Sequence, residues 1–160
     1  MPIPTEASDL ENAHCAPSSR PTLGAAFAIL RDHWQRGDHD RELALHLLFL
    51  AWYGLIEPEH ITGFQTDEAT RVVLQRTFHD VHRTVANEIE RDPEMLYVVG
   101  LMANLAPWLL GDVVEWEQRS KGYRALYRAL APNGLDPRIF EGRGAYGGYF
   151  AGQARVPNGY

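Results

Sequence analysis

The sequence predicts an all-α protein built from two stacked helical hairpins and a connecting amphipathic helix. Apolar residues recur at three- and four-residue steps over most of the chain after residue 22. Helix start and stop signals separate these stretches. One order of elements, a helix, a Gly-Asp turn, a long helix and a Pro stop, occurs twice. With 160 residues, 45% hydrophobic and 22% charged, the chain is long enough to bury one core.

The first 21 residues predict a flexible leader. They carry four prolines among Ser, Glu and Asn residues and show no apolar period. We therefore expect residues 1–21 to stay outside the core and residues 22–160 to form a single α-helical domain.

The first hairpin is predicted from residue 23 to residue 56. Its first helix runs from Leu23 to Arg36, and Gly37 stands where a C-capping glycine is expected. Asp38 can then cap a second helix, whose residues 43–53 are apolar around almost the whole circumference. This second helix should be the central, buried one.

The connecting helix follows a loop at residues 57–63. Thr66 or Asp67 can cap it, and the apolar period continues to about Arg91 along one face only. One side of this helix should therefore face the core and the other side water.

The second hairpin starts at Asp92-Pro93-Glu94, because Asp caps a helix and proline is tolerated at its first position. Pro107 should kink or end the fourth helix near Leu105. The fifth helix starts at Asp112 and continues to Leu130. A short helical turn and a glycine-rich tail at residues 142–160 follow.

An internal repeat relates residues 23–58 to residues 97–132. An ungapped shift of 74 positions produces the identities Trp34/Trp108, Gly37/Gly111, Asp38/Asp112, Ala51/Ala125, Tyr53/Tyr127 and Pro58/Pro132. Either the chain contains a duplication, or two unrelated hairpins use the same capping chemistry.

The two hairpins resemble the tetratricopeptide (TPR) family of helical repeats over about half of the chain. The resemblance lies in two sets of residues: Gly37, Asp38, Ala44, Ala51 and Pro58, and Gly111, Asp112, Tyr123, Ala125, Ala129, Pro132 and Asn133. It implies a TPR-like helical array that binds peptides or proteins.

Chemistry-bearing motifs are sparse, so we expect no cofactor and no metal. The seven histidines mostly lack metal-ligand spacing, and Cys15 is the only cysteine. His79-Asp80 resembles the central dipeptide of the HD phosphohydrolases. That resemblance implies a metal-dependent phosphohydrolase with His46 and Asp112 as the outer members of the set, which is the enzymatic alternative.

The glycine-rich tail carries the candidate binding residues Arg143, Tyr146 and Tyr149. Glycines free the backbone while aromatic rings and an arginine offer stacking, so the tail could hold phosphate or nucleic acid. The favoured interpretation is that these rings fold back over the end of the fifth helix.

Charge is unevenly distributed within a formal net charge of −6. Residues 32–68 hold eight acids and two arginines, and residues 92–117 hold five acids and no base. The acidic turns favour a basic protein partner over sequence-specific nucleic-acid binding. The predicted contact residues are Trp34, Asp38, Asp40, Glu42, Tyr53, Glu57 and Glu59.

The leading hypothesis is therefore a non-enzymatic protein-interaction module, such as an acidic bacterial immunity or adaptor protein. The longest apolar run, residues 43–56, is too short to cross a bilayer, so no membrane association is expected. Nothing near Met1 reads as a signal peptide, and the cytoplasm is the expected compartment.

Overall fold

The structure, a computed structural model, describes residues 2–16 and 20–156, and within these ranges the chain forms ten α-helices, one 3-10 turn and no β-strand. The all-α class predicted from the sequence is confirmed. The five predicted helices correspond to α2 (Leu23–Gln35), α3 (Arg41–Ile56), α5 (Glu68–Thr84), α7 (Pro93–Leu105) and α9 (Val113–Leu130).

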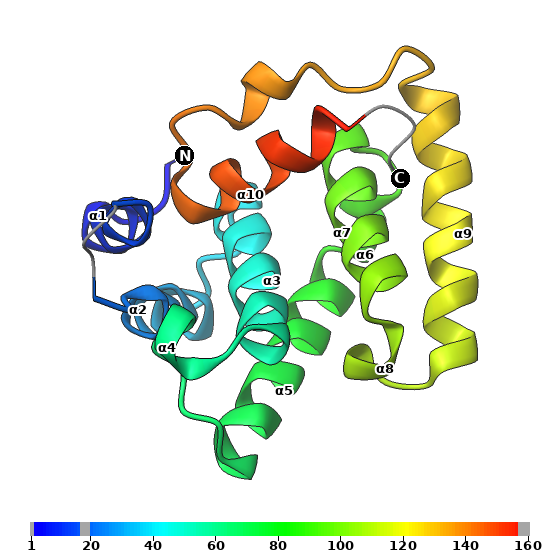
Figure 1. The fold of residues 1–160 in the computed structure, drawn as a ribbon. Coiled ribbons are helices and arrows are strands. Elements are labelled where there is room, and N and C mark those ends of the chain that lie inside the picture. Colours follow the sequence, from blue (N-terminus) through cyan, green and yellow to red (C-terminus); the bar gives the residue numbers. More distant parts are fainter. Residues whose placement is uncertain (1, 17–19, 157–160) are drawn as a thin grey trace.

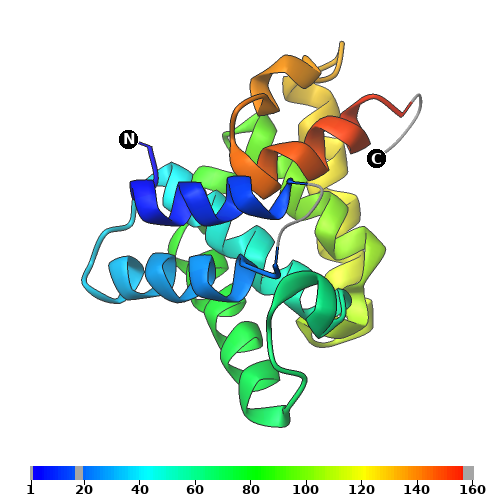
Figure 2. The same cartoon turned by 60° about the vertical axis from the view of Figure 1, so that its left-hand side comes forward.

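Helix α3 lies at the centre of the molecule (Figure 1). Helix α2 and the N-terminal helix α1 (Thr5–His14) lie side by side on one flank, as Figures 1 and 2 both show. On the other flank α7 packs along α9, which forms the opposite edge of the fold. Helix α5 crosses α3 from below, and α10 (Gly144–Ala154) covers it from above.

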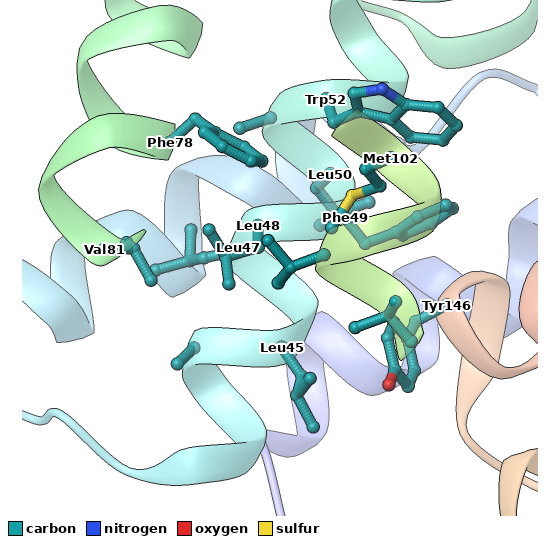
Figure 3. Close-up of a cluster of buried hydrophobic side chains, with 14 of the residues drawn as sticks. Leu45, Leu47, Leu48, Phe49, Leu50, Trp52, Phe78, Val81, Met102 and Tyr146 are labelled. Carbon is teal, nitrogen blue, oxygen red and sulfur yellow. The ribbon is translucent and has the colours of Figure 1, made fainter. Parts of the chain in front are cut away.

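The apolar circumference of α3 explains its central place. Every residue from Leu43 to Trp52 is buried, so the helix is covered from all sides, as the sequence predicts. Figure 3 shows its leucines and aromatic residues among side chains of α5, α7 and α10, including Phe78, Met102 and Tyr146.

Aspartate caps fix the starts of four long helices. The side chains of Asp67, Asp92 and Asp112 accept backbone N–H groups at the starts of α5, α7 and α9, as predicted. Helix α3 is capped by Asp40 rather than by Asp38, because the chain needs the extra residues to reverse direction after Gly37. Asp38 instead accepts the N–H of Asp40.

Three short helices modify the predicted boundaries. The connecting helix does not run unbroken to Arg91, because α5 ends at Thr84 and a separate turn, α6 (Ala86–Ile89), follows. The predicted loop after α3 contains α4 (Glu59–Thr62), which ends at Gly63 with a φ of +78°. The break at Pro107 is confirmed, and Pro107 starts α8 (Pro107–Leu110).

The prediction of a flexible leader is wrong for residues 5–14, which form α1. This helix packs on α2 and α10 and buries Ala7 and Glu11. Its apolar period is short, because only a few residues such as Ala7 and Leu10 reach the core, and the buried polar side chain of Glu11 adds an attachment that a hydrophobicity pattern does not register. Residues 17–19 of the predicted leader lie outside the described residues.

The short helical turn predicted before the glycine-rich tail is the 3-10 turn η1 (Pro137–Phe140), and the tail itself forms the helix α10. A Cβ atom added at Gly147 would lie 2.1 Å from the carbonyl oxygen of Phe140, so glycine lets η1 and α10 approach closely. The tail packs against α1 and α3, where the sequence favoured the end of the fifth helix instead. Residues 157–160 lie outside the described part of the chain.

Among the helices of the described residues, none combines the length and the apolar character needed to cross a bilayer.

Candidate functional site

A buried ion network, formed by Glu11, Glu42, His46, Glu94, Arg143 and Tyr146, joins four helical segments. Atom Nδ1 of His46 lies 2.6 Å from Oε2 of Glu11, and its Nε2 lies 3.2 Å from Oε1 of Glu42. Arg143, at the start of α10, donates to both oxygens of Glu42 at 2.7 and 2.6 Å. The network thus connects α1, α3 and α10 through charged hydrogen bonds.

Glu94 extends the network to α7. It accepts from Arg143 and, at 2.6 Å, from the hydroxyl group of Tyr146. Its other oxygen accepts from Arg41 at 2.8 Å, and Arg41 also donates to Asp92. Each of the three glutamates has at least two donors, since Glu11 also accepts the backbone N–H of Tyr146.

These contacts determine the charge states within the network. Burial lowers the pKa of His46, but hydrogen bonds to Glu11 and Glu42 outweigh burial and raise that pKa above its ordinary value. Burial raises the pKa of Glu42, but His46 and Arg143 overcome this and lower it to about 2. Burial and the neighbouring Glu94 raise the pKa of the Tyr146 hydroxyl. At neutral pH the network is a set of paired ions with satisfied hydrogen bonds.

The stability of the protein should fall at alkaline pH because of His46. A group whose pKa is raised on folding stabilises the fold fully below its unfolded pKa of about 6.5, and this stabilisation is lost as pH rises through the folded pKa. A neutral imidazole donates only one hydrogen bond, so either Glu11 or Glu42 then loses one of its donors. Urea unfolding should show a slope of up to about 1.4 kcal/mol per pH unit above pH 6.5.

The variant His46→Gln provides the control for this pH dependence, because glutamine does not titrate. Its free energy of unfolding should be lower near pH 6 and should lack the slope that His46 contributes. An identical slope in both proteins would contradict the assignment of the titration to His46.

The residues predicted for the acidic contact surface do not form one exposed surface in the structure. Trp34 is only 4% exposed, and its Nε1–H donates to Asp80 at 2.9 Å, so Trp34 does not present an exposed anchor. Glu42 belongs to the buried ion network, and Asp40 caps α3. Asp38 and Glu57 are half-buried, and Glu59 is exposed.

The predicted tail residues are also brought inside. Tyr146 is fully buried, and Arg143 is engaged by Glu42 and Glu94. Tyr149 is half-buried and packs against Tyr53, with ring centroids 5.8 Å apart. The structure therefore places Tyr53 and Tyr149, predicted for two different surfaces, beside each other.

The four residues that the HD resemblance implies do not meet. His46 contacts Glu11 and Glu42, while Asp80 bonds to Trp34 and Arg83. Only His79 and Asp112 share a surface, a cleft of about 470 Å³ between α5 and the start of α9. Within the described ranges, no group of three or more His, Cys, Asp or Glu side chains is arranged to hold a metal ion.

An exposed apolar corner lies where α7, α8 and α9 meet, at the lower end of α9 in Figure 1. Trp108 is 63% exposed there and Val114 61%. Leu105 and Val113 are exposed beside them in sequence, and these four residues define the Trp108 corner. Asp112, Glu115 and Glu117, all exposed, start the same helix. In the sequence, Trp108 stands out only as the repeat counterpart of Trp34.

Comparisons of the chain with protein-family models, with curated proteins and with solved structures found no significant match.

Proposed function

We propose that this protein is a non-enzymatic protein-interaction module that binds a basic partner through the Trp108 corner. An immunity or adaptor protein would act in this way. The class of function and the basic charge of the partner are those expected from the sequence. The proposed contact surface lies at the second hairpin turn instead of the first.

The exposure of Trp108 carries the proposal. The chain has four tryptophans, and the other three, Trp34, Trp52 and Trp116, are at most 4% exposed. An exposed indole ring among exposed aliphatic side chains is unfavourable in water and typical of a contact surface. Tryptophan is also enriched among the residues that dominate binding energy in interfaces.

The charge at the corner favours a basic partner. Asp112, Glu115 and Glu117 lie within the first turns of α9, and no base is present from residue 92 to residue 117. Arg119 pairs with Glu115 at 2.7 Å, so the negative charge offered to a partner is that of Asp112 and Glu117. Such acidic groups at the rim of an apolar contact accelerate the association of a positively charged partner.

The experiment starts with a photo-reactive amino acid in place of the exposed Val114, which leaves Trp108 intact and covalently captures the partner in cells for identification. Affinity for the purified partner is then measured by calorimetry. Trp108→Ala should weaken binding at least about 30-fold, the effect of a dominant interface residue. Leu126→Ala, which changes an exposed apolar residue farther along α9, should leave the affinity nearly unchanged.

The charge contribution has its own measurement. Glu117→Lys should slow association and reduce its dependence on salt, because exposed charges steer the encounter. Equal affinities of Trp108→Ala and the unmodified protein would contradict the proposal and remove the Trp108 corner as the contact surface.

A further inference from the structure

An aromatic cavity of about 220 Å³ lies between α1, α3 and α10, apart from the Trp108 corner. Three rings line it, Phe49 and Tyr53 from α3 and Tyr149 from α10. His14 and Cys15 border it from the end of α1, and Ala145 and Gly148 form its small-residue wall. The cavity is therefore assembled from three segments that are far apart in the sequence.

The three rings form a continuous aromatic wall. The ring centroids of Phe49 and Tyr53 are 5.0 Å apart, and Tyr149 lies 5.6 Å from Phe49 and 5.8 Å from Tyr53. The rings of Tyr53 and Tyr149 are inclined at 65° to each other, so a ligand in the cavity meets them from two directions. Tyr53 and Tyr149 are half-buried, and Phe49 is buried in the core behind them.

Glycine at position 148 keeps the opposite wall open. A Cβ atom there would lie 4.0 Å from Sγ of Cys15, so any larger side chain would extend into the space between α10 and the end of α1. Gly148 is exposed and its neighbour Gly147 is buried against η1, so the two glycines serve different purposes.

The electrostatic environment of the cavity is negative. Burial lowers the pKa of His14 and raises the pKa of the Cys15 thiol, so both are uncharged at neutral pH. Burial and then Glu57 raise the pKa of Tyr53. Burial, Tyr53 and Glu57 raise the pKa of Tyr149 to about 12. The carboxylates acting on these four lining groups are those of Glu11 and Glu57, and because Glu11 is paired with His46, Glu57 supplies the negative charge.

We propose that the aromatic cavity binds a small alkylated ammonium cation, such as the head group of choline. Aromatic faces attract a cation through their negative quadrupole, and they suit a cation whose methyl groups also need apolar contact. The carboxylate of Glu57 adds to this attraction, and none of the described residues that line the cavity is an arginine or a lysine. A bare ammonium ion is more strongly hydrated and lacks the apolar contact.

Choline and its uncharged isostere 3,3-dimethyl-1-butanol test the proposal directly. They have nearly the same shape, so calorimetry compares charge at constant volume. Choline should bind at least about tenfold more tightly than the alcohol, as expected for a desolvated cation–π contact. Ring resonances of Tyr53 and Tyr149 should shift in NMR spectra during the choline titration.

Matched variants locate the binding energy. Tyr149→Leu removes one ring and should weaken choline binding about tenfold, and Glu57→Gln removes the nearby charge and should weaken it about threefold. Glu59→Gln, two positions further along at the exposed start of α4, is the control and should leave choline binding unchanged. Because Glu57 and Glu59 lie near the surface, both variants should fold.

A peptide containing trimethyllysine distinguishes the source of the cation. If the peptide binds more tightly than choline, the ligand of the cavity is a methylated protein side chain. If choline binds more tightly, the ligand is a free small molecule. Equal binding of choline and the uncharged alcohol, or no binding of either, would overturn the proposal. An unchanged affinity in both Tyr149→Leu and Glu57→Gln would overturn it as well.

Discussion

Replacing Arg143 by methionine should lower the free energy of unfolding by about 3–5 kcal/mol. The substitution keeps most of the volume of the side chain but removes the guanidinium group that pairs with Glu42 and Glu94. Glu42 then keeps His46 and Glu94 keeps Arg41 as a charged hydrogen-bond donor, and removing one partner of a buried ion pair costs more than the intact pair contributes. Chemical denaturation monitored by circular dichroism measures the loss.

Arg138→Met is the matched control for this experiment. Arg138 belongs to η1, only five positions earlier, and pairs with Asp136 in full exposure to water. Exposed ion pairs contribute little to stability, so this variant should unfold at the same denaturant concentration as the unmodified protein. Equal destabilisation by the two variants would contradict a structural role of the buried ion network.

A triple variant tests whether the cost arises from the unpaired carboxylates. Combining Arg143→Met with Glu42→Gln and Glu94→Gln removes both negative charges together with their partner. Because contacting residues are not additive, the triple variant should be more stable than the sum of the separate effects predicts. Additive losses would indicate that Arg143 acts through packing alone.

The long helices could be predicted from the sequence because their signals are local. Asp92 and Pro93 determine the start of α7 within three residues, and Asp112 does the same for α9. The apolar circumference of α3 predicts its central position without any knowledge of its neighbours.

The two terminal helices could not be predicted from local sequence patterns. Helix α1 is attached through Glu11, whose main partner His46 is 35 positions away in the sequence. Helix α10 contains four glycines within eleven residues, which reads as a flexible segment. In the structure Gly147 instead allows the close approach of two backbones, and the distinction depends on the position of Phe140.

The candidate site could be predicted only in part, because its residues come from distant parts of the sequence. Glu42 and Arg143 were both singled out from the sequence, but as members of separate surfaces. Their pairing spans 101 positions, and charge runs alone cannot show that two such runs meet in the interior. Trp34 and Trp108 occupy equivalent positions in the 74-residue shift, yet Trp34 is buried and donates to Asp80, while Trp108 is 63% exposed. The sequence pattern does not distinguish a tryptophan that packs in the core from one that is exposed for contact. Only its burial in the structure does.

Replacing Leu48 by alanine should lower the free energy of unfolding by about 2–5 kcal/mol. Leu48 is fully buried in the middle of α3, within the cluster of buried side chains that Figure 3 shows. Part of the loss is the transfer of methyl groups from the core to water in the unfolded chain. The remainder depends on the cavity, because missing contacts are recovered only where neighbouring groups move in.

The central position of α3 is the reason to expect the upper part of this range. Helices α2, α5, α7 and α10 contact α3 from different sides, so none can move toward the vacated space without leaving another contact. Leu126→Ala removes the same atoms from a side chain that is 40% exposed on α9, and should cost about 0.5 kcal/mol or less. Urea unfolding of both variants measures the difference. A loss below about 1 kcal/mol for Leu48→Ala would mean that the helices around α3 rearrange to fill the cavity, which contradicts a close-packed centre.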